Sequence, residues 1–557
     1  MKYLAKIVLF CCCGSLVFSA TAQQTVGLLS YVPMKSFDGY NLMYPHNQPN
    51  VYLLDNCGEI VHVWEDSTNY RPGNMAYLLE NGHLLKAKRP ASIAGDAIWA
   101  GGGGATVELR DWDNQLLWSF TLNDSLNRLH HDIAPKPNGN ILLLSWERKS
   151  REEAIAAGRD TALLSQNNLW PDYLMEVQPI GPDSFEIVWQ WHVWDHLIQD
   201  FDSTKANYGV VGDHPELVDI NWDTNDGASD WMHTNALDYD PVHEQVLISV
   251  PTFHEVWIID QSTSTAQAAG HTGGMSNRGG DLMYRWGNPA AYQQGDSTDQ
   301  RLFYPHDIHW VDDFLTASHP QYRRLAAFNN RVTADSSTVV AWNPSWDMYS
   351  WSYLMDGNRW EPAELDWIYS HPDKSLMHST GLSSVQFLPN GNALVCVGRW
   401  GYSFEVTPDE EIVWEYKTPL IGGNPANQGD TLAINNNLTF RLKRYPADYA
   451  AFQGKALTSI GYIEQNPDTT FCDQFISSVD DRFEYHISVY PNPASEQLTI
   501  EWEGGRYVDI ELLNMWGQSM KRFRESGGRK YLDVSDWQKG LYFIRVDSKA
   551  TVKIVLE

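Results

Sequence analysis

Short runs of alternating apolar and polar residues make up most of the chain, and two of these patterns recur. In the first, an Asn-Gly turn leads into an apolar strand: NGHLL at Asn81, NGNILLL at Asn138 and NGNALVCV at Asn390. In the second, a turn leads into a strand with an aromatic ending: CGEIVHVWED from Cys57, DNQLLWSF from Asp113, SFEIVWQW from Ser184 and DEEIVWEY from Asp409. Such turns between alternating runs are typical of β-hairpins.

Helical periodicity is scarce outside the short stretch RKSREEAIAAG, so the sequence predicts an all-β fold. Repeated four-stranded units with aromatic endings favour a β-propeller, in which aromatic residues pack between neighbouring blades. The spacing of the repeats predicts six blades within residues 23–465. A seven-bladed propeller is the first alternative, and an array of β-sandwiches is the second.

Three histidines share one phase of this repeat, because each begins an apolar strand after a loop. They stand in the steps HDIAP (His131), HTNAL (His233) and HDIHW (His306). Ser383 falls in register with His131 when the Pro-Asn-Gly turns are superposed. If these strands are the innermost of their blades, the histidines meet at one end of the central channel, and the repeat itself builds a binding site.

The first 22 residues have the pattern of a secretory signal peptide. Lys2 and Lys6 precede the apolar stretch from Ile7 to Ala20, and Ala20-Thr21-Ala22 offers a cleavage site. Cys11, Cys12 and Cys13 lie inside that stretch and would be removed with it. No later segment is long and apolar enough to span a bilayer, so we expect a soluble mature protein.

The formal charge of -30 becomes two units more negative once Lys2 and Lys6 are removed. Such a charge argues against nucleic acid or an anionic membrane as a partner. A site for an anionic substrate must therefore create a local positive pocket. Three cysteines remain after cleavage, and at most one disulfide can form; a bridge between Cys57 and Cys472 would close the large domain. Their spacing matches no zinc signature.

A separate module follows a linker at residues 466–486. Its short strands alternate with turns, which predicts a small β-sandwich over residues 487–557. The module resembles the C-terminal sorting domain of the type IX secretion system of the Bacteroidetes. The matching residues are the Pro491-Asn492-Pro493 start, the Gly517 turn and Gly540-Leu541-Tyr542. The resemblance implies passage through that machinery and a secreted or cell-surface location.

Two stretches of the large domain carry a second resemblance. DLMYRWGNPAAYQQGDSTDQRLFYPHDIHWVDD from Asp281 and WMHTNALDYDPVHEQVLISV from Trp231 are similar to the aryl-sulfate sulfotransferases, over about residues 50–420. That resemblance implies transfer of a sulfuryl group from an aryl sulfate ester to a phenol through a sulfohistidine. Such an enzyme needs no nucleotide donor, and the chain has no GxxxxGK[ST] loop. The glycines at 101–104 lack the lysine, and we interpret them as a turn.

The resemblance assigns roles to individual residues. The sulfated histidine matches His306, the paired histidine and asparagine match His233 and Asn235, and a further active-site histidine matches His131. We interpret His233 and Asn235 as facing the channel together, because residues two apart on a strand share a face. A neutral imidazole is a suitable nucleophile near neutral pH, and imidazoles and amides suit the sulfonate oxygens.

Several alternatives remain open at this stage. His309 is a second candidate for the reactive histidine, and His130 for the role of His131. An arginine that the family places after the His-x-Asn motif falls on Pro251, and Arg331 or Arg285 are the candidates to replace it. His254 and His378 are interpreted as structural, as are most of the 24 tryptophans.

Two other classes of function compete with sulfuryl transfer. One is a non-catalytic surface propeller that binds a small ligand or glycan, which the loss of the family arginine at Pro251 favours. The other is a metal centre held by three channel histidines. The His-x-Asn pairing supplies hydrogen-bond donors more naturally than metal ligands, so we expect no cofactor and no metal site. Nothing in the pattern specifies an oligomeric state.

Overall fold

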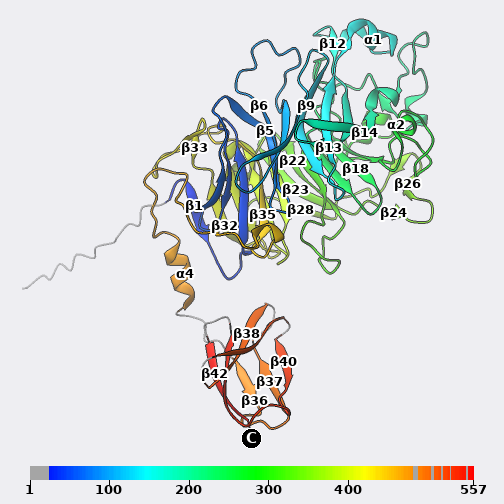
Figure 1. The fold of residues 1–557 in the computed structure, drawn as a ribbon. Helices are drawn as coiled ribbons and strands as arrows, with labels where there is room; N and C mark the ends of the chain where they lie inside the picture. Colours follow the sequence, from blue (N-terminus) through cyan, green and yellow to red (C-terminus); the bar gives the residue numbers. More distant parts are fainter. Residues whose placement is uncertain are drawn as a thin grey trace, which may run out of the picture. The chain divides into compact units, whose positions relative to one another are not determined.

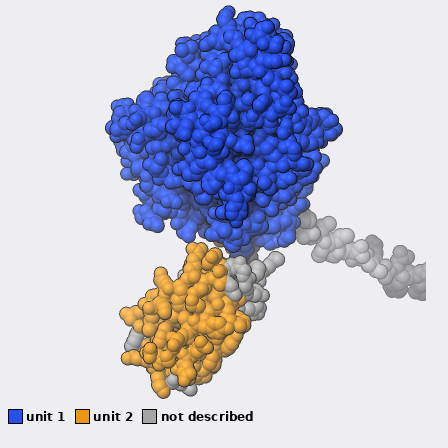
Figure 2. Space-filling view, turned by 90° about the vertical axis from the view of Figure 1, so that its right-hand side faces the viewer, with its two compact units in different colours: residues 1–472 blue, residues 473–557 orange. Residues whose placement is uncertain are grey.

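The computed structural model describes residues 24–480, 487–502, 507–515, 518–526, 528–546 and 550–556. The chain divides into two compact units, residues 1–472 and 473–557, which Figure 2 colours separately. The signal peptide expected at residues 1–22 and the Gly517 turn lie outside the described residues. In the described part of the chain, no helix has the length and apolar character needed to cross a membrane.

Six antiparallel sheets of four or five strands dominate the first unit (Figure 1). The strands of each sheet are given in their order across the sheet. The first sheet consists of β35 (Thr439–Pro446), β2 (Gly39–Pro45), β3 (Val51–Leu54) and β4 (Ile60–Trp64), and the second of β5 (Tyr70–Leu78), β6 (Leu84–Pro90), β7 (Thr106–Arg110) and β8 (Leu116–Thr121). The third consists of β9 (Asn127–Pro135), β10 (Ile141–Glu147), β13 (Asp172–Gly181) and β14 (Ser184–His192).

The other three sheets continue along the chain, and the last one gains a fifth strand from the N-terminal end. They are β17 (Ala236–Asp240), β18 (Gln245–Val250), β19 (Glu255–Asp260) and β20 (Tyr284–Trp286); β21 (Pro305–Trp310), β22 (Leu325–Thr333), β23 (Ser336–Trp342) and β28 (Trp367–Tyr369); and β29 (Ser384–Phe387), β30 (Ala393–Val397), β31 (Tyr402–Val406), β32 (Ile412–Lys417) and β1 (Gly27–Tyr31). The two chain ends thus close the structure, since β35 joins the first sheet and β1 the last.

Short elements decorate the loops between these strands. The short strands pair as β11 (Lys149–Ser150) with β12 (Asn168–Leu169), β15 (Leu197–Ile198) with β16 (Val218–Asp219), β24 (Trp346–Asp347) with β25 (Ser352–Tyr353), β26 (Met355–Asp356) with β27 (Arg359–Trp360), and β33 (Leu420–Ile421) with β34 (Asn424–Pro425). The helices of this unit are α1 (Arg151–Ala156), α2 (Thr265–Ala268) and α3 (Lys374–Met377).

Both sequence repeats occupy fixed places in these sheets. The Asn-Gly turns connect the first and second strands of three sheets, where Gly82, Gly139 and Gly391 have φ of 83°, 87° and 93°. The strands with aromatic endings are β4, β8, β14 and β32, each the fourth strand of its sheet. The predicted propeller of antiparallel blades is therefore confirmed, and taking one blade per sheet gives six blades.

Tryptophans of the fourth strands join several blades to the next. The indole N–H of Trp64 donates to the Asp111 carbonyl in the following blade at 3.2 Å, and that of Trp118 to Ser184 at 3.1 Å. The last blade is joined to the first in the same way, by Trp414 and the Asn56 carbonyl at 2.8 Å. Buried indoles need such partners, so the aromatic endings both fill and fasten the gaps between blades.

The six innermost strands contact one another in the closed cycle β35, β5, β9, β17, β21 and β29. One buried network, here the Arg441 network, ties them together. The Arg441 guanidinium pairs with Asp132 and Asp307, each at 2.7 Å. Every innermost strand supplies one member: Tyr77, Asp132, Leu237 N, Asp307, Val385 N and Arg441. Burial favours loss of the Arg441 charge, but the two carboxylates outweigh it and raise its pKa.

Cys57 and Cys472 form a disulfide, which ties the β3–β4 turn to the last residue of the first unit. Helix α4 (Asp473–Asp480) follows at once, inside the range expected to be a linker. The third cysteine, Cys396, is buried, and its burial raises the pKa of the thiol to about 12.

Removing this disulfide should destabilise the first unit. A covalent link between residues 415 positions apart restricts the unfolded chain, so Cys57→Ser with Cys472→Ser should cost about 2–4 kcal/mol of unfolding free energy. Urea unfolding followed by tryptophan fluorescence measures this cost. A reductant should lower the midpoint of the unmodified protein and leave the double variant unchanged; equal midpoints for both proteins would contradict a stabilising role.

The second unit packs two sheets around one core. The sheets are β36 (Ser488–Tyr490), β37 (Gln497–Glu501) and β40 (Arg529–Asp533), and β39 (Ser519–Glu525), β38 (Val508–Asn514), β41 (Gly540–Val546) and β42 (Ala550–Leu556). Asn492, in the middle of the Pro-Asn-Pro start, bonds to the backbone of β42: it donates to the Lys553 carbonyl and accepts from Val555 N. The motif thus fastens the two ends of the predicted β-sandwich.

Candidate active site

The innermost strands are irregular at one level of the channel. Residues with positive φ occur there in five strands or at their starts: Asn74 (94°), His131 (49°), His233 (55°), Asp307 (57°) and Ser383 (89°). The pairing of β5, β9 and β21 with their second strands also shifts register at these points. A bulge changes the direction of a side chain. These irregularities therefore bring the histidines, which share one phase of the repeat, to the same level of the channel.

His131 and His233 are in contact across two blades. Their ring centroids lie 4.6 Å apart at an interplanar angle of 77°. Nδ1 of His131 also lies 2.9 Å from Nδ1 of His130, whose ring stacks on Trp146. Burial, followed by the charges of His233 and His130, holds the pKa of His131 well below its ordinary value. His131 is therefore a neutral imidazole, and His130 contacts its Nδ1.

The glycine run at 101–104 closes over the same pair. A Cβ at Gly102 would lie 2.0 Å from Nε2 of His131, and φ at Gly102 is 82°. A Cβ at Gly101 would lie 3.9 Å from Cε1 of His233. The run is therefore a turn, as the sequence suggests, but one whose lack of side chains admits the imidazole of His131.

Asp230 sets the charge of His233. Its Oδ2 lies 2.5 Å from Nδ1 of His233, and the His233 side chain keeps 16% of its surface exposed. Burial alone would lower the pKa of His233, but the charge and hydrogen bond of Asp230 outweigh it, so the pKa is raised above its ordinary value. Asp230 thus favours the protonated form of His233, in contrast to the neutral His131.

Asn330 fixes the tautomer of His306. The Asn330 amide nitrogen donates to the carbonyls of Ser379 (2.9 Å) and Leu382 (3.0 Å), which turns its oxygen toward Nδ1 of His306 at 2.7 Å. An amide oxygen only accepts, so Nδ1 carries the proton and Nε2 keeps its lone pair. Burial, followed by the charge of His233, lowers the pKa of His306 to about 3.

A glycine and aromatic rings surround the buried His306. Gly381 lies next to it, and even a Cβ there would stay 3.9 Å from Nε2. Phe440 separates His306 from His131, with centroid distances of 6.5 and 6.3 Å. The ring of Tyr304 lies 5.8 Å from that of His306 and 6.0 Å from that of His233. The structure therefore gathers His131, His233 and His306 into one cluster.

Asn235 does not face this cluster. Its side chain is fully buried, donates to the Pro305 carbonyl at 3.0 Å and accepts from the Ser249 hydroxyl at 2.5 Å. This differs from the expectation that His233 and Asn235 share a face, because the left-handed conformation of His233 interrupts the strand alternation. Asn235 instead fastens its own strand to the residue that precedes His306.

Two arginines give the cluster a positive side. The guanidinium of Arg331 stacks 3.4 Å from the ring centroid of Tyr304, and its charge reaches His233. Arg399 lies close to Arg331 and Tyr304, and burial followed by Arg331 lowers its pKa. Arg285, the other candidate, is fully buried and paired with Glu255 at 2.6 Å, so its charge is already compensated.

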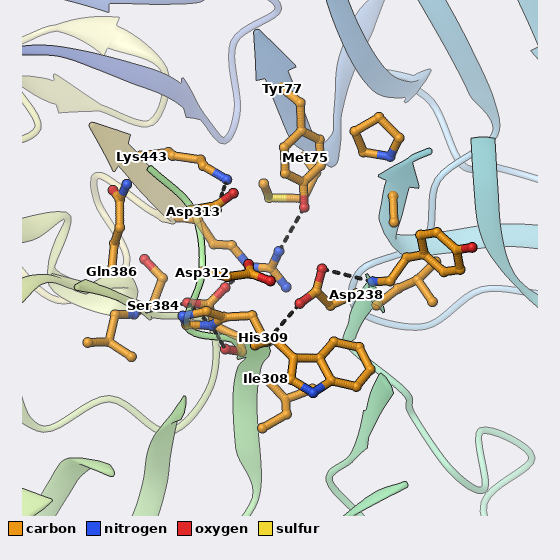
Figure 3. Close-up of a pocket in the computed structure, with 18 of the residues that line it drawn as sticks. Met75, Tyr77, Asp238, Ile308, His309, Asp312, Asp313, Ser384, Gln386 and Lys443 are labelled. Carbon is orange, nitrogen blue, oxygen red and sulfur yellow. Dashed lines mark hydrogen bonds and ion pairs between the residues drawn. The ribbon is translucent and has the colours of Figure 1, made fainter. Parts of the chain in front are cut away.

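His309 lies on the other side of the Arg441 network, in a cavity of about 280 Å³ that Figure 3 shows. Asp238, Asp312 and Lys443 line the same cavity. Nδ1 of His309 lies 2.8 Å from the Asp307 carbonyl. His309 is therefore separated from the other channel histidines. Within the described ranges, no group of three converging metal donors includes a channel histidine.

Asp230, Tyr304, Asn330 and Arg399 belong to the site but were not predicted from the sequence. Two of them had a usable signal: Asp230 precedes His233 by three residues, and Tyr304 precedes the Pro-His-Asp step directly. Asn330 lies on β22, the strand paired with β21, and Arg399 lies in the next blade, so only the packing of strands and blades brings them to His306. His254 accepts a hydrogen bond from Tyr304 N at 3.0 Å, in keeping with a structural role.

Comparison with known proteins supports both resemblances. Residues 488–557 match the secretion system C-terminal sorting domain, which confirms the type IX module and indicates export to a secreted or cell-surface location. No curated protein matches the chain. Similar solved structures include virginiamycin B lyase from Staphylococcus aureus (8% identity, 68% of this chain, 85% of that one, TM-score 0.30) and periplasmic gluconolactonase from Pseudomonas aeruginosa (12%, 73%, 98%, 0.32). Residues 31–422 match the arylsulfotransferase (ASST) family across the blades that carry the histidine cluster, and the chain belongs to that family.

Proposed function

We propose that the protein moves a sulfuryl group from an aryl sulfate ester to a phenol through a covalent intermediate on Nε2 of His306, without a nucleotide donor. Family membership supports the class of reaction. The observation that carries the choice of nucleophile is the Asn330 bond, because it leaves the lone pair of a neutral imidazole on Nε2. A pKa of about 3 keeps this imidazole neutral throughout the physiological range.

The first half of the proposed reaction forms the N–S bond. Nε2 of His306 attacks sulfur, the bond from sulfur to the aryl oxygen breaks, and the phenolate leaves with the electron pair. The proton that His233 holds beside Asp230 neutralises the phenolate. In the second half, the acceptor phenol gives its proton to His233 while its oxygen attacks sulfur, and the bond to Nε2 breaks. Atoms and charge balance over the two halves.

Arg331 and Arg399 are the proposed partners of the sulfonate oxygens. The protein carries a formal charge of -30, so an anionic substrate needs local compensation. The two guanidiniums provide it beside Tyr304, and among the described residues neither is paired with a carboxylate. Arg331 donates to the Thr380 carbonyl and Arg399 to the Asn435 amide oxygen. They are proposed to replace the family arginine that is missing at Pro251, and they come from two other blades.

Asn235 is proposed as a positioning residue. Its bond to the Pro305 carbonyl holds the start of β21, from which the His306 side chain projects. The neutral His131 lies against His233 and is proposed to contact the aryl oxygen or a sulfonate oxygen. Both proposals follow from the contacts of the side chains rather than from a shared strand face.

Arg331→Ala and Arg399→Ala should each slow turnover by about 10²–10³-fold, the usual effect of losing one preorganised donor. Arg359→Ala is the matched control, because this arginine is 42% exposed and pairs with Asp299 away from the cluster. Steady-state kinetics with a chromogenic aryl sulfate measure the change. Unaltered turnover in both channel variants would mean that the sulfonate is held by other groups.

The experiment that tests the proposed function is intact-mass measurement after exposure to an aryl sulfate without acceptor. We expect a gain of one sulfuryl group, which an added phenol removes. Release of the chromogenic phenol should rise when an acceptor phenol is present. A protein that gains no mass and releases no phenol would instead be a non-catalytic propeller that binds a small ligand or glycan.

A further inference from the structure

A second cluster of chemistry-bearing side chains lies outside the channel, where two blades meet. His196 follows β14 after a 3₁₀ turn (Val193–Asp195), while His271 and Asp281 belong to the connection between β19 and β20. Nδ1 of His196 and Nδ1 of His271 each lie 2.8 Å from the same oxygen, Oδ1 of Asp281. All three atoms lie within 4.8 Å of one another, and no other such group occurs among the described residues.

The orientation of His196 is fixed on every side. Its side chain is fully buried, and its ring stacks on Trp191 with centroids 5.7 Å apart and an interplanar angle of 7°. Its Nε2 lies 2.8 Å from the Ala268 carbonyl oxygen. A carbonyl only accepts, so Nε2 carries the proton of the neutral ring and Nδ1 directs its lone pair at the Asp281 carboxylate. Two acceptors at this distance require a cation between them or a second proton on the ring.

The loop that carries His271 and Asp281 is built around this arrangement. Gly280 N donates to the Gly270 carbonyl at 2.9 Å, which closes the loop into a ring of backbone. A Cβ at Gly280 would lie 2.0 Å from the Ala268 oxygen and 2.6 Å from Nε2 of His196. Only a glycine allows His196, the Ala268 carbonyl and the loop to approach so closely.

We propose that His196, His271 and Asp281 bind a zinc ion through the two Nδ1 atoms and Oδ1. Two imidazoles and one carboxylate form a typical zinc ligand set, whereas calcium and magnesium prefer oxygen donors alone. The bond from Nε2 of His196 to the Ala268 carbonyl is the support that a metal-bound histidine usually has. The His271 side chain is 61% exposed, which leaves room for a water as the remaining ligand.

Such an ion would fasten the β19–β20 connection to the turn after β14 in the preceding blade. The site is structural and independent of the sulfuryl transfer proposed above. Its ligands lie in a protein with a secreted or cell-surface location, where the metal would be taken up from the surroundings.

Isothermal titration of the full chain with zinc sulfate, after treatment with a chelator, tests the proposal. The unmodified protein should bind one more zinc ion than His271→Ala and than Asp281→Asn. His271 is exposed, so its replacement leaves the core intact. His214→Ala is the matched control, because His214 is 50% exposed and contacts Glu216 in a pair with no third donor; it should bind zinc as the unmodified protein does.

Extended X-ray absorption fine-structure spectroscopy of the zinc-loaded protein gives the types and distances of the zinc ligands. We expect zinc–nitrogen distances of about 2.0–2.1 Å from two histidines in the unmodified protein. Equal zinc stoichiometry in the unmodified protein and in His271→Ala would overturn the proposal and put any bound ion elsewhere, for example on the channel histidines. An absence of zinc binding by the unmodified protein would also overturn it, and would mean that His196 is doubly protonated against Asp281.

Discussion

Replacing His306 by alanine should abolish both aryl-sulfate turnover and the sulfuryl adduct. The variant loses the lone pair on Nε2 of His306, which the hydrogen bond between Nδ1 and Asn330 leaves available. Loss of a nucleophile that forms a covalent intermediate should lower turnover by at least about 10⁴-fold. Chromogenic turnover and intact mass, measured on the same preparation, detect the two losses together.

His309→Ala is the control for this variant. It removes an imidazole from the same strand, but from the cavity beyond the Arg441 network (Figure 3), so turnover should change little. Asn330→Ala tests the role of the hydrogen bond between Asn330 and His306. This variant keeps the nucleophile but should form the sulfuryl adduct more slowly. An adduct that persists in His306→Ala would show that the assignment is wrong and make His131 or His309 the candidate.

Replacing His233 should cost the second largest share of the rate, and its pH dependence identifies its role. His233→Ala removes the proton donor for the leaving phenolate and should slow turnover by about 10²–10³-fold. His233 has a raised pKa, so the donor is protonated below that pKa and is lost as pH rises through it. Turnover with a poor leaving group should therefore fall on the alkaline side, above a pKa higher than 6.5.

Asp230→Asn should move this alkaline limb to lower pH. The carboxylate is what raises the pKa of His233 against the opposing effect of burial, so its loss lets burial lower the pKa. Rate profiles of the two proteins, with the same aryl sulfate, measure the shift. The acidic side should stay flat to about pH 4 in both, because the pKa of His306 is about 3. A limb that moves upward, or that does not move, would contradict a proton on His233.

The architecture could be predicted from the sequence because each blade repeats two local signals. Asn-Gly turns need positive φ at Gly82, Gly139 and Gly391, and tryptophans such as Trp64 need a neighbouring blade to bury them. Both signals lie within a few residues of the chain and do not depend on distant contacts. The histidine phase follows from the same repeat, which is why three residues far apart in sequence could be expected at one place.

The finer features of the site depend on backbone irregularity and on contacts between neighbouring blades, and neither leaves a simple pattern. The left-handed conformation of His233 turns Asn235 away from the cluster, although strand alternation predicts a common face. Arg399 lies in a 3₁₀ turn (Gly398–Trp400) of the last blade, about 90 residues after His306, and reaches the cluster because this blade packs beside the blade of His306. A sequence window contains neither piece of information.

The Arg441 network has a consequence for the order of events in catalysis. It joins all six innermost strands below the histidine cluster, and the side chains of Arg441 and Asp132 are almost fully buried. The cavity that holds His309 lies beyond this network and is not lined by His306, so in the proposed reaction we expect donor and acceptor to approach from the side of the histidine cluster. If the proposed sulfohistidine forms, the first phenol should leave before the second attacks it, and we expect ping-pong kinetics. A phenol bound to the free enzyme should then block the aryl sulfate, so we expect the acceptor to inhibit at high concentration.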